Sequence, residues 1–181
     1  MQSHRRKARP PCRWSAAVIV LAIVAAGPCG SGLRAQGDER PARVAPWPCR
    51  LVVKPTLLGV IEDGWQRSAT LQRQCRELAD WRAVVVLEWG ATDSQSRALT
   101  RMRITEEGIV VARVSIPPVG DAIVLVAHEL EHVIERASGV DLRAESKRRG
   151  SGVWQAYGGF ETQRAIEVAR QVSEELREQA R

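Results

Sequence analysis

Two histidines stand four residues apart in the segment HELEH at residues 128–132, and this spacing constrains how the surrounding chain can fold. In an α-helix, side chains four residues apart lie on the same face, one turn apart. The chain contains only one further histidine, His4, near its start. Two imidazoles that leave a helix in the same direction, next to a glutamate, suit a divalent metal ion. We therefore expect a helix through this segment that holds a metal.

Residues 1–35 have the composition of a secretory signal peptide. Residues 1–13 are basic and contain no acidic residue, the run AAVIVLAIVAA follows at 16–26, and small residues then lead to Ala35. The apolar run is shorter than the roughly 20 residues that a membrane-spanning helix needs. We expect cleavage near Ala35, a secreted or periplasmic location and no membrane span after cleavage. An uncleaved membrane anchor is the alternative.

The charge balance changes at the same point. The whole chain has 27 Lys and Arg against 21 Asp and Glu, but its first 35 residues hold only basic charges. The remainder carries 21 charges of each sign and is therefore neutral. A nucleic-acid binder needs a surplus of cations to displace phosphate counterions. We therefore expect no nucleic-acid partner.

The part that follows residue 35 is predicted to form one domain. Residues 36–48 are polar and rich in proline, which is typical of a linker, and residues 49–181 are long enough for one modest core. Cys49 and Cys75 are an even pair in a chain that we expect to be exported, so a single disulfide bond is the default expectation. Two buried free thiols are the alternative.

Strand and helix patterns alternate along residues 49–181 and predict an α+β fold. We expect a short mixed or antiparallel sheet that packs on the metal-binding helix and on a C-terminal helix. The predicted strands are RLVV within 49–56, VVVL within 82–89, and a hairpin formed by 97–105 and 109–116 with Gly108 in its turn. The predicted helices are 68–81 with Ser68 as its N-cap, 121–138, and about 160–177.

The helix at 121–138 is predicted to have two different faces. At 100° per residue its large apolar side chains gather on one side, which we expect to face the core. This core face comprises Ile123, Val126, Leu130, Val133, Ile134 and Ala137. Val124, His128, His132 and Glu135 gather on the opposite side and are expected to face a cleft.

A catalytic zinc site uses three protein ligands, so His128 and His132 need one more. Glu161 is the preferred candidate, because it falls on the apolar stripe of the predicted C-terminal helix, where an unpaired carboxylate would be costly. The alternative is that Glu161 caps that helix by accepting its first amides. Asp141 and Glu145 are closer in sequence but stand in polar surroundings, and are less favoured.

Two further residues are predicted to take part in the chemistry. Glu129 is swung about 100° from His128 around the helix, which suits a general base that contacts water and not the metal. Tyr157 is a candidate donor to a developing oxyanion, and its alternative is ordinary packing in a loop.

The segment AHELEHVIE at 127–135 resembles the active-site helix of the zincin metallopeptidases, and a glutamate as third ligand would make the site similar to the gluzincins. The resemblance covers roughly residues 108–165 and is specific only over the helix. It implies Zn2+ as cofactor, a peptide or protein substrate, and an edge strand before the helix that pairs with the substrate, for which 109–116 has the matching position. Glu131 is charged where zincins usually carry an uncharged residue.

These observations predict an exported zinc-dependent peptidase with His128, His132 and Glu161 as ligands and Glu129 as base. Two alternatives remain open. One is a non-catalytic exported module in which the same site binds metal structurally or sequesters it. The other is an interaction domain without metal, in which the histidines face solvent and the glutamates of the helix form ordinary salt bridges.

Overall fold

The computed structural model describes residues 43–44, 47–90, 98–118, 121–156 and 158–181, with the side chains of 43–44 excepted. All of these belong to the unit Asp38–Arg181. The predicted signal peptide, most of the predicted linker and Tyr157 lie outside the described residues. Among the described residues, no helix is both long enough and apolar enough to cross a membrane.

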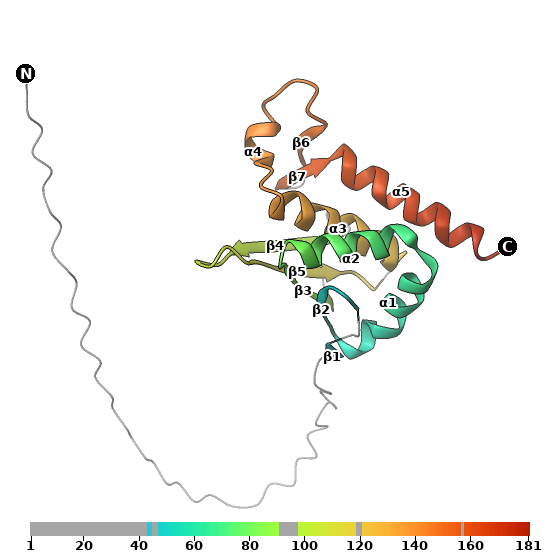
Figure 1. Cartoon of the computed structure of the whole chain (residues 1–181). Helices are drawn as coiled ribbons and strands as arrows, with labels where there is room; N and C mark the ends of the chain where they lie inside the picture. The colour runs from blue at the N-terminus through green and yellow to red at the C-terminus, as the bar shows by residue number, and fades with distance from the viewer. Residues whose placement is uncertain (1–42, 45–46, 91–97, 119–120, 157) are drawn as a thin grey trace, which may run out of the picture. The chain divides into compact units, whose positions relative to one another are not determined.

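A five-stranded mixed sheet forms one layer of the domain, with the strands in the order β1-β2-β3-β5-β4 (Figure 1). The central strands β2, β3 and β5 are parallel, whereas β1 and β4 pair antiparallel at the two edges. Their bounds are Arg43–Val44 for β1, Arg50–Val53 for β2, Val84–Trp89 for β3, Leu99–Ile104 for β4 and Val110–Ile116 for β5. The predicted mixed sheet and the predicted β4–β5 hairpin are confirmed, with Gly108 at a positive φ of 76° in the turn.

One strand has a different place from the predicted one. Residues 109–116 were expected to form an edge strand, but β5 lies inside the sheet, between β3 and β4. The reason is that alternate β5 residues, from Val110 to Ile116, are buried under the helices, while both sides of the strand are hydrogen-bonded. Among the described residues, the edge strand beside the helix that carries His128 and His132 is therefore β4.

Helices cover one face of this sheet. Helix α3 (Ala122–Ala137) lies between the sheet and α5 (Gln163–Glu178), and it contacts β4 and β5 as well as α2 (Ala69–Asp80) (Figure 1). Helix α2 begins at its predicted N-cap Ser68, whose side chain accepts a hydrogen bond from the amide of Leu71. Helix α1 (Pro55–Arg67), which begins at a proline, was not predicted.

Two short elements connect α3 to α5. The single turn α4 (Leu142–Glu145) comes first, followed by a separate antiparallel hairpin of β6 (Val153–Ala156) and β7 (Gly159–Thr162). This hairpin was not predicted, and it occupies part of the range that was predicted as the start of the C-terminal helix. Helix α5 consequently begins at Gln163 and not near residue 160.

Helix α3 is more deeply enclosed than its sequence pattern indicates. The predicted core face is confirmed, because Ile123, Val126, Leu130, Val133 and Ile134 are buried. Of the side that was expected to face a cleft, His132 and Glu135 are at most 8% exposed, and the His128 side chain is 17% exposed. Glu129 and Glu131 are buried as well. The cause is the position of α3 between the sheet, α2 and α5, which leaves little of its circumference open to solvent.

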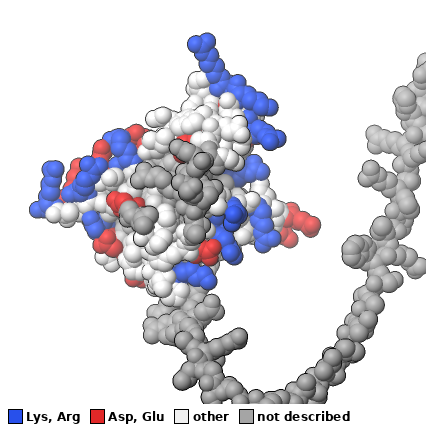
Figure 2. Space-filling view, turned by 180° about the vertical axis from the view of Figure 1, so that it is seen from behind, with Lys and Arg blue, Asp and Glu red and all other residues white. Residues whose placement is uncertain are grey.

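The predicted disulfide bond is present between Cys49 and Cys75, whose Cα atoms are 5.0 Å apart. It joins the residue before β2 to the middle of α2 and so fixes this helix to the sheet at the start of β2. On the face of the molecule in Figure 2, basic and acidic side chains both appear around the margin. This mixture of signs agrees with the neutral charge balance of the chain after residue 35.

Candidate metal centre

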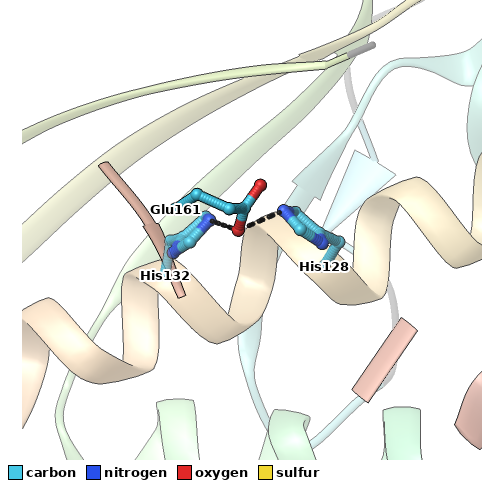
Figure 3. Close-up of side chains that lie close together, drawn as sticks. All are labelled: His128, His132 and Glu161. Atoms are coloured by element: carbon cyan, nitrogen blue, oxygen red, sulfur yellow. Dashed lines mark ion pairs between the residues drawn. The ribbon is translucent and has the colours of Figure 1, made fainter. Parts of the chain in front are cut away.

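His128, His132 and Glu161 come together in the structure and could hold a metal ion. One ligand atom from each of them lies within 4.8 Å of the other two. The Oε1 atom of Glu161 lies 3.3 Å from Nε2 of His128 and 3.5 Å from Nε2 of His132, between the two rings (Figure 3). Two imidazole nitrogens and a carboxylate oxygen therefore converge on one point above α3.

The two histidines owe their positions to a single turn of α3. Their ring centroids are 5.0 Å apart, and the two rings are nearly perpendicular. Both Nε2 atoms point to the same side of the helix, toward Glu161. This common direction is what the four-residue spacing predicts. Enclosure of α3 limits the exposure of the His128 and His132 side chains to 17% and 10%.

The third member of the group comes from a strand and not from the predicted helix. Glu161 lies in β7, opposite Trp154 of β6, and its side chain is 22% exposed. The alternative capping role belongs to its neighbour, because the Thr162 hydroxyl accepts the amide of Ala165 at 3.0 Å. The Glu161 carboxylate accepts a hydrogen bond of 2.8 Å from the amide of Thr162, the residue before α5. It accepts none from the first-turn amides of α5 at 163–165.

The two less favoured acidic candidates have other partners. Asp141 caps α4 by accepting the amide of Ala144 at 3.0 Å, and Glu145 pairs with Arg148. Neither belongs to the His–Glu group. Of the three carboxylates considered from the sequence, the structure thus brings only Glu161 to the histidines.

The charges of the group stabilise each other. Burial by itself would raise the pKa of Glu161, but hydrogen bonds with His128 and His132 outweigh it and hold this pKa well below its usual range. Burial would lower the pKa of His132, but the carboxylates of Glu135 and Glu161 outweigh it and raise this pKa to about 9. A metal ion would replace the proton as the positive partner of Glu161, since both compete for the imidazole nitrogens.

The surroundings of His132 also fit a metal ligand. Its Nδ1 atom lies 3.1 Å from Oε2 of Glu135, which is buried one turn further along α3. A carboxylate on Nδ1 fixes the ring orientation and leaves Nε2 free for a metal, as is usual for metal-binding histidines. The sequence placed Glu135 on the same helix face but gave no role to it, although its i+3 spacing from His132 was the available signal.

Glu129 approaches the edge strand of the sheet. Its Oε2 atom accepts a hydrogen bond of 2.5 Å from the hydroxyl of Thr100 on β4. Its charge is also close enough to contribute to the raised pKa of His132. Sequence reasoning missed Thr100, because only the antiparallel pairing of β4 with β5 brings this residue over α3.

A surface cleft of about 940 Å³ adjoins the centre on the side of α4. Its walls include Glu135, which bonds to His132, and Thr162, which follows Glu161 in the chain. None of His128, His132 and Glu161 lines this cleft. Tyr157, the predicted oxyanion donor, lies outside the described residues.

Comparison of the chain with known proteins finds no matching family model, no matching curated protein and no matching solved structure. The function of this protein therefore has to be inferred from the residues of the site themselves.

Proposed function

We propose that this protein is an exported zinc-dependent peptidase that hydrolyses a bond within a peptide or protein substrate. The observation that carries the proposal is the convergence of His128, His132 and Glu161 within 4.8 Å, with Glu129 at the next position of the same helix. Two imidazoles and one carboxylate are a ligand set that catalytic zinc commonly uses, with one coordination position left for the reaction. The resemblance of residues 127–135 to zincin active-site helices supports the same activity.

Within this proposal, each residue has a defined task. A bound zinc ion would polarise the substrate carbonyl and make water more acidic. Glu129 accepts a proton from the attacking water as its oxygen forms a bond to the carbonyl carbon. The same carboxyl group then gives this proton to the amine nitrogen as the carbon–nitrogen bond breaks. Glu135 holds the ring of His132 in place throughout.

Thr100 orients the proposed general base, Glu129. Its hydroxyl donates to the Glu129 carboxylate from the edge strand β4, so the carboxylate is already oriented toward that edge. Because no strand of the described residues pairs with the outer side of β4, an extended peptide could add to the sheet there with its backbone near Glu129. Tyr157 stays a predicted oxyanion donor.

Two features support export to an oxidising compartment. One is the basic and apolar composition of residues 1–35, which is typical of a signal peptide. The other is the disulfide bond between Cys49 and Cys75, since such bonds persist mainly outside the reducing cytosol.

The replacement Glu129→Gln tests the catalytic role. Gln cannot accept the proton, so the variant should bind zinc with nearly unchanged affinity while peptide cleavage falls by at least about 100-fold. Zinc content is measured by elemental analysis, and cleavage is measured on a mixed peptide library by mass spectrometry. Glu174→Gln, an exposed change on α5, is the matched control and should cleave normally. Cleavage that survives Glu129→Gln contradicts the proposal.

The low exposure of the ligand side chains favours a second candidate, a closed site that binds metal without catalysis. The exposed fractions are 17% for His128, 10% for His132 and 22% for Glu161. Cobalt can replace zinc and reports its ligands through its absorption spectrum. If the site is open, adding a hydroxamate should change the spectrum of the cobalt protein; if the site is closed, the spectrum should stay unchanged.

A further inference from the structure

Glu131, the charged residue between the two histidines, is the most deeply buried carboxylate on α3. Its exposed fraction is 0%, compared with 8% for Glu129 and 5% for Glu135. Its partners lie on α2 and α5. Burial of an ionised carboxylate is costly unless charged and hydrogen-bonding partners compensate for the loss of water. The partners of Glu131 therefore indicate why this position is not apolar.

Two side chains supply this compensation. The guanidinium of Arg164, from the first turn of α5, reaches inward and pairs through Nε with Oε1 of Glu131. The amide of Gln74, fully buried on α2, donates to Oε2 of Glu131 at 2.8 Å. The Gln74–Glu131–Arg164 network thus connects three helices that are far apart in the sequence.

The residues of this network also contact or lie within three residues of each member of the metal-binding group. Gln74 also donates to the carbonyl oxygen of Ala127 at 2.8 Å, and Ala127 directly precedes His128. Glu131 directly precedes His132, and Arg164 follows Glu161 by three residues, just beyond the end of β7. The two histidines lie on α3, whereas Glu161 lies on a different element, so something must fix the distance between these two elements.

Apolar packing alone defines this distance poorly. The buried residues of α5 that are closest in sequence to Glu161 are small or medium in size, namely Ala165, Val168 and Val172. The ion pair of Glu131 with Arg164, together with the hydrogen bond from Gln74, adds a directional constraint to this apolar contact. Arg164 is itself held from its exposed side, because its Nη2 atom lies 3.6 Å from Oε2 of Glu77 on α2.

We propose that Glu131 and Arg164, supported by Gln74, are positioning residues that hold Glu161 at the distance from His128 and His132 that a metal ion requires. This inference rests on the metal centre of the proposed function, but not on its catalytic activity. It also explains the charge at position 131, because the network needs a carboxylate at that point. A buried ion pair often adds little to stability in comparison with an apolar pair, so its role here is to define geometry.

The decisive experiment is the double replacement Glu131→Leu with Arg164→Leu, assayed by zinc affinity. Leucine at both positions removes the ion pair without leaving one charge buried alone, so the melting temperature should stay close to that of the wild type. Zinc affinity, measured by competition with a chromogenic chelator, should fall by about 10- to 100-fold, as for other partners of metal ligands. X-ray absorption of the zinc-loaded variant should show a weakened or missing carboxylate ligand.

Arg170→Leu is the matched control, because Arg170 lies on the same helix and forms surface ion pairs with Glu167 and Glu174. Its zinc affinity should equal that of the wild type. Arg164→Lys, which keeps the charge but not the planar donor group, should fall between the wild type and the double variant. If the double variant does not fold, Glu131→Gln with Arg164→Gln replaces it, since this pair also leaves no lone buried charge and keeps an acceptor for Gln74.

The outcomes separate the positioning role from the proposed function. A folded double variant, with leucine or with glutamine at both positions, whose zinc affinity stays within threefold of the wild type overturns the positioning role and leaves the peptidase proposal intact. A loss of zinc affinity in these variants, in a protein that proves unable to cleave peptides, supports the positioning role and contradicts the peptidase proposal. A wild-type protein that binds no zinc overturns both.

Discussion

Two partly buried glutamates near opposite ends of α5 have different kinds of hydrogen-bonding partners. Glu161, just before the helix, lies between two imidazole nitrogens that are metal-ligand atoms. Glu175, near its end, accepts the hydroxyls of Ser68 and Thr70 and the amide of Thr70, at 2.6 to 3.2 Å. The donors of Glu175 form the first turn of α2, where a negative charge is favourable. The comparison indicates that Glu175 completes a helix end, whereas Glu161 completes the candidate metal centre.

The largest difference is expected from removing each carboxylate in turn. Glu161→Ala takes away one of three ligands, so zinc affinity should fall by at least about 100-fold while the protein stays folded. Glu175→Ala should leave zinc affinity unchanged. Isothermal titration with zinc measures both variants. Glu145→Ala, which removes an acidic residue paired only with Arg148 at the surface, is the control and should titrate like the wild type.

The free energy of unfolding of the metal-free protein should fall more for Glu175→Ala than for Glu161→Ala. Glu175→Ala leaves the Ser68 and Thr70 hydroxyls and an amide of α2 without their acceptor, which should lower the free energy of unfolding by about 2 kcal/mol. Urea denaturation of the metal-free protein measures this loss. Equal losses for Glu175→Ala and Glu161→Ala would remove the distinction between the two ends of the helix.

Zinc should stabilise the folded protein through Glu161, at the start of α5, and not through Glu175. At a free zinc concentration 100 times its dissociation constant, the expected gain is about 2.7 kcal/mol, because only the folded chain brings the three ligands together. Thermal unfolding with zinc and with a chelator measures the gain. The Glu175→Ala variant should show the same gain from its lower starting point, and Glu161→Ala should show almost none.

The dependence on pH should be smaller but has a defined sign. In the metal-free protein the raised pKa of His132, about 9, gives stability that is fully present below about 6.5 and is lost as the pH rises through 9. The lowered pKa of Glu161 gives stability that is present above about 4.5 and is lost in stronger acid. The metal-free protein should therefore be more stable at pH 6 than at pH 10, as urea midpoints would reveal.

Zinc should reverse this trend in part. Protons compete with zinc for the imidazole nitrogens, so the stabilisation by zinc should be weaker at pH 6 than at pH 8. Glu175→Ala should keep both trends, because Glu175 is remote from the histidines. If Glu161→Ala showed the same pH dependence as the wild type, the ion pairs of Glu161 would not be its origin.

The elements that could be predicted from the sequence are those set by short-range spacing or by simple pairing rules. The helix around His128 and His132, the N-cap Ser68, the β4–β5 hairpin and the Cys49–Cys75 bond all follow from local spacing or pairing rules, and the structure contains them. Glu161 was selected for the cost of burying a carboxylate. The structure brings it to the histidines from β7 and not from the helix, so the predicted secondary structure, on which that reason depended, was wrong.

The unpredicted part depends on contacts between distant segments. Residues 153–162 form a hairpin that has no strong alternation of apolar residues, so its sequence resembles a loop. The contact of Thr100 with Glu129 requires the order of strands in the sheet, which periodicity does not specify. Burial of Glu131 requires knowledge that Arg164 faces it from another helix. None of these contacts leaves a signal within a short window of sequence.

The most direct measurement is the metal content of the purified protein together with X-ray absorption at the zinc edge. The expected result is one zinc ion per chain, bound by two imidazole nitrogens at about 2.0 to 2.1 Å and by a carboxylate oxygen. The signal should lose one imidazole in His128→Ala. Folded protein without stoichiometric zinc, or zinc held by other residues, would contradict the account.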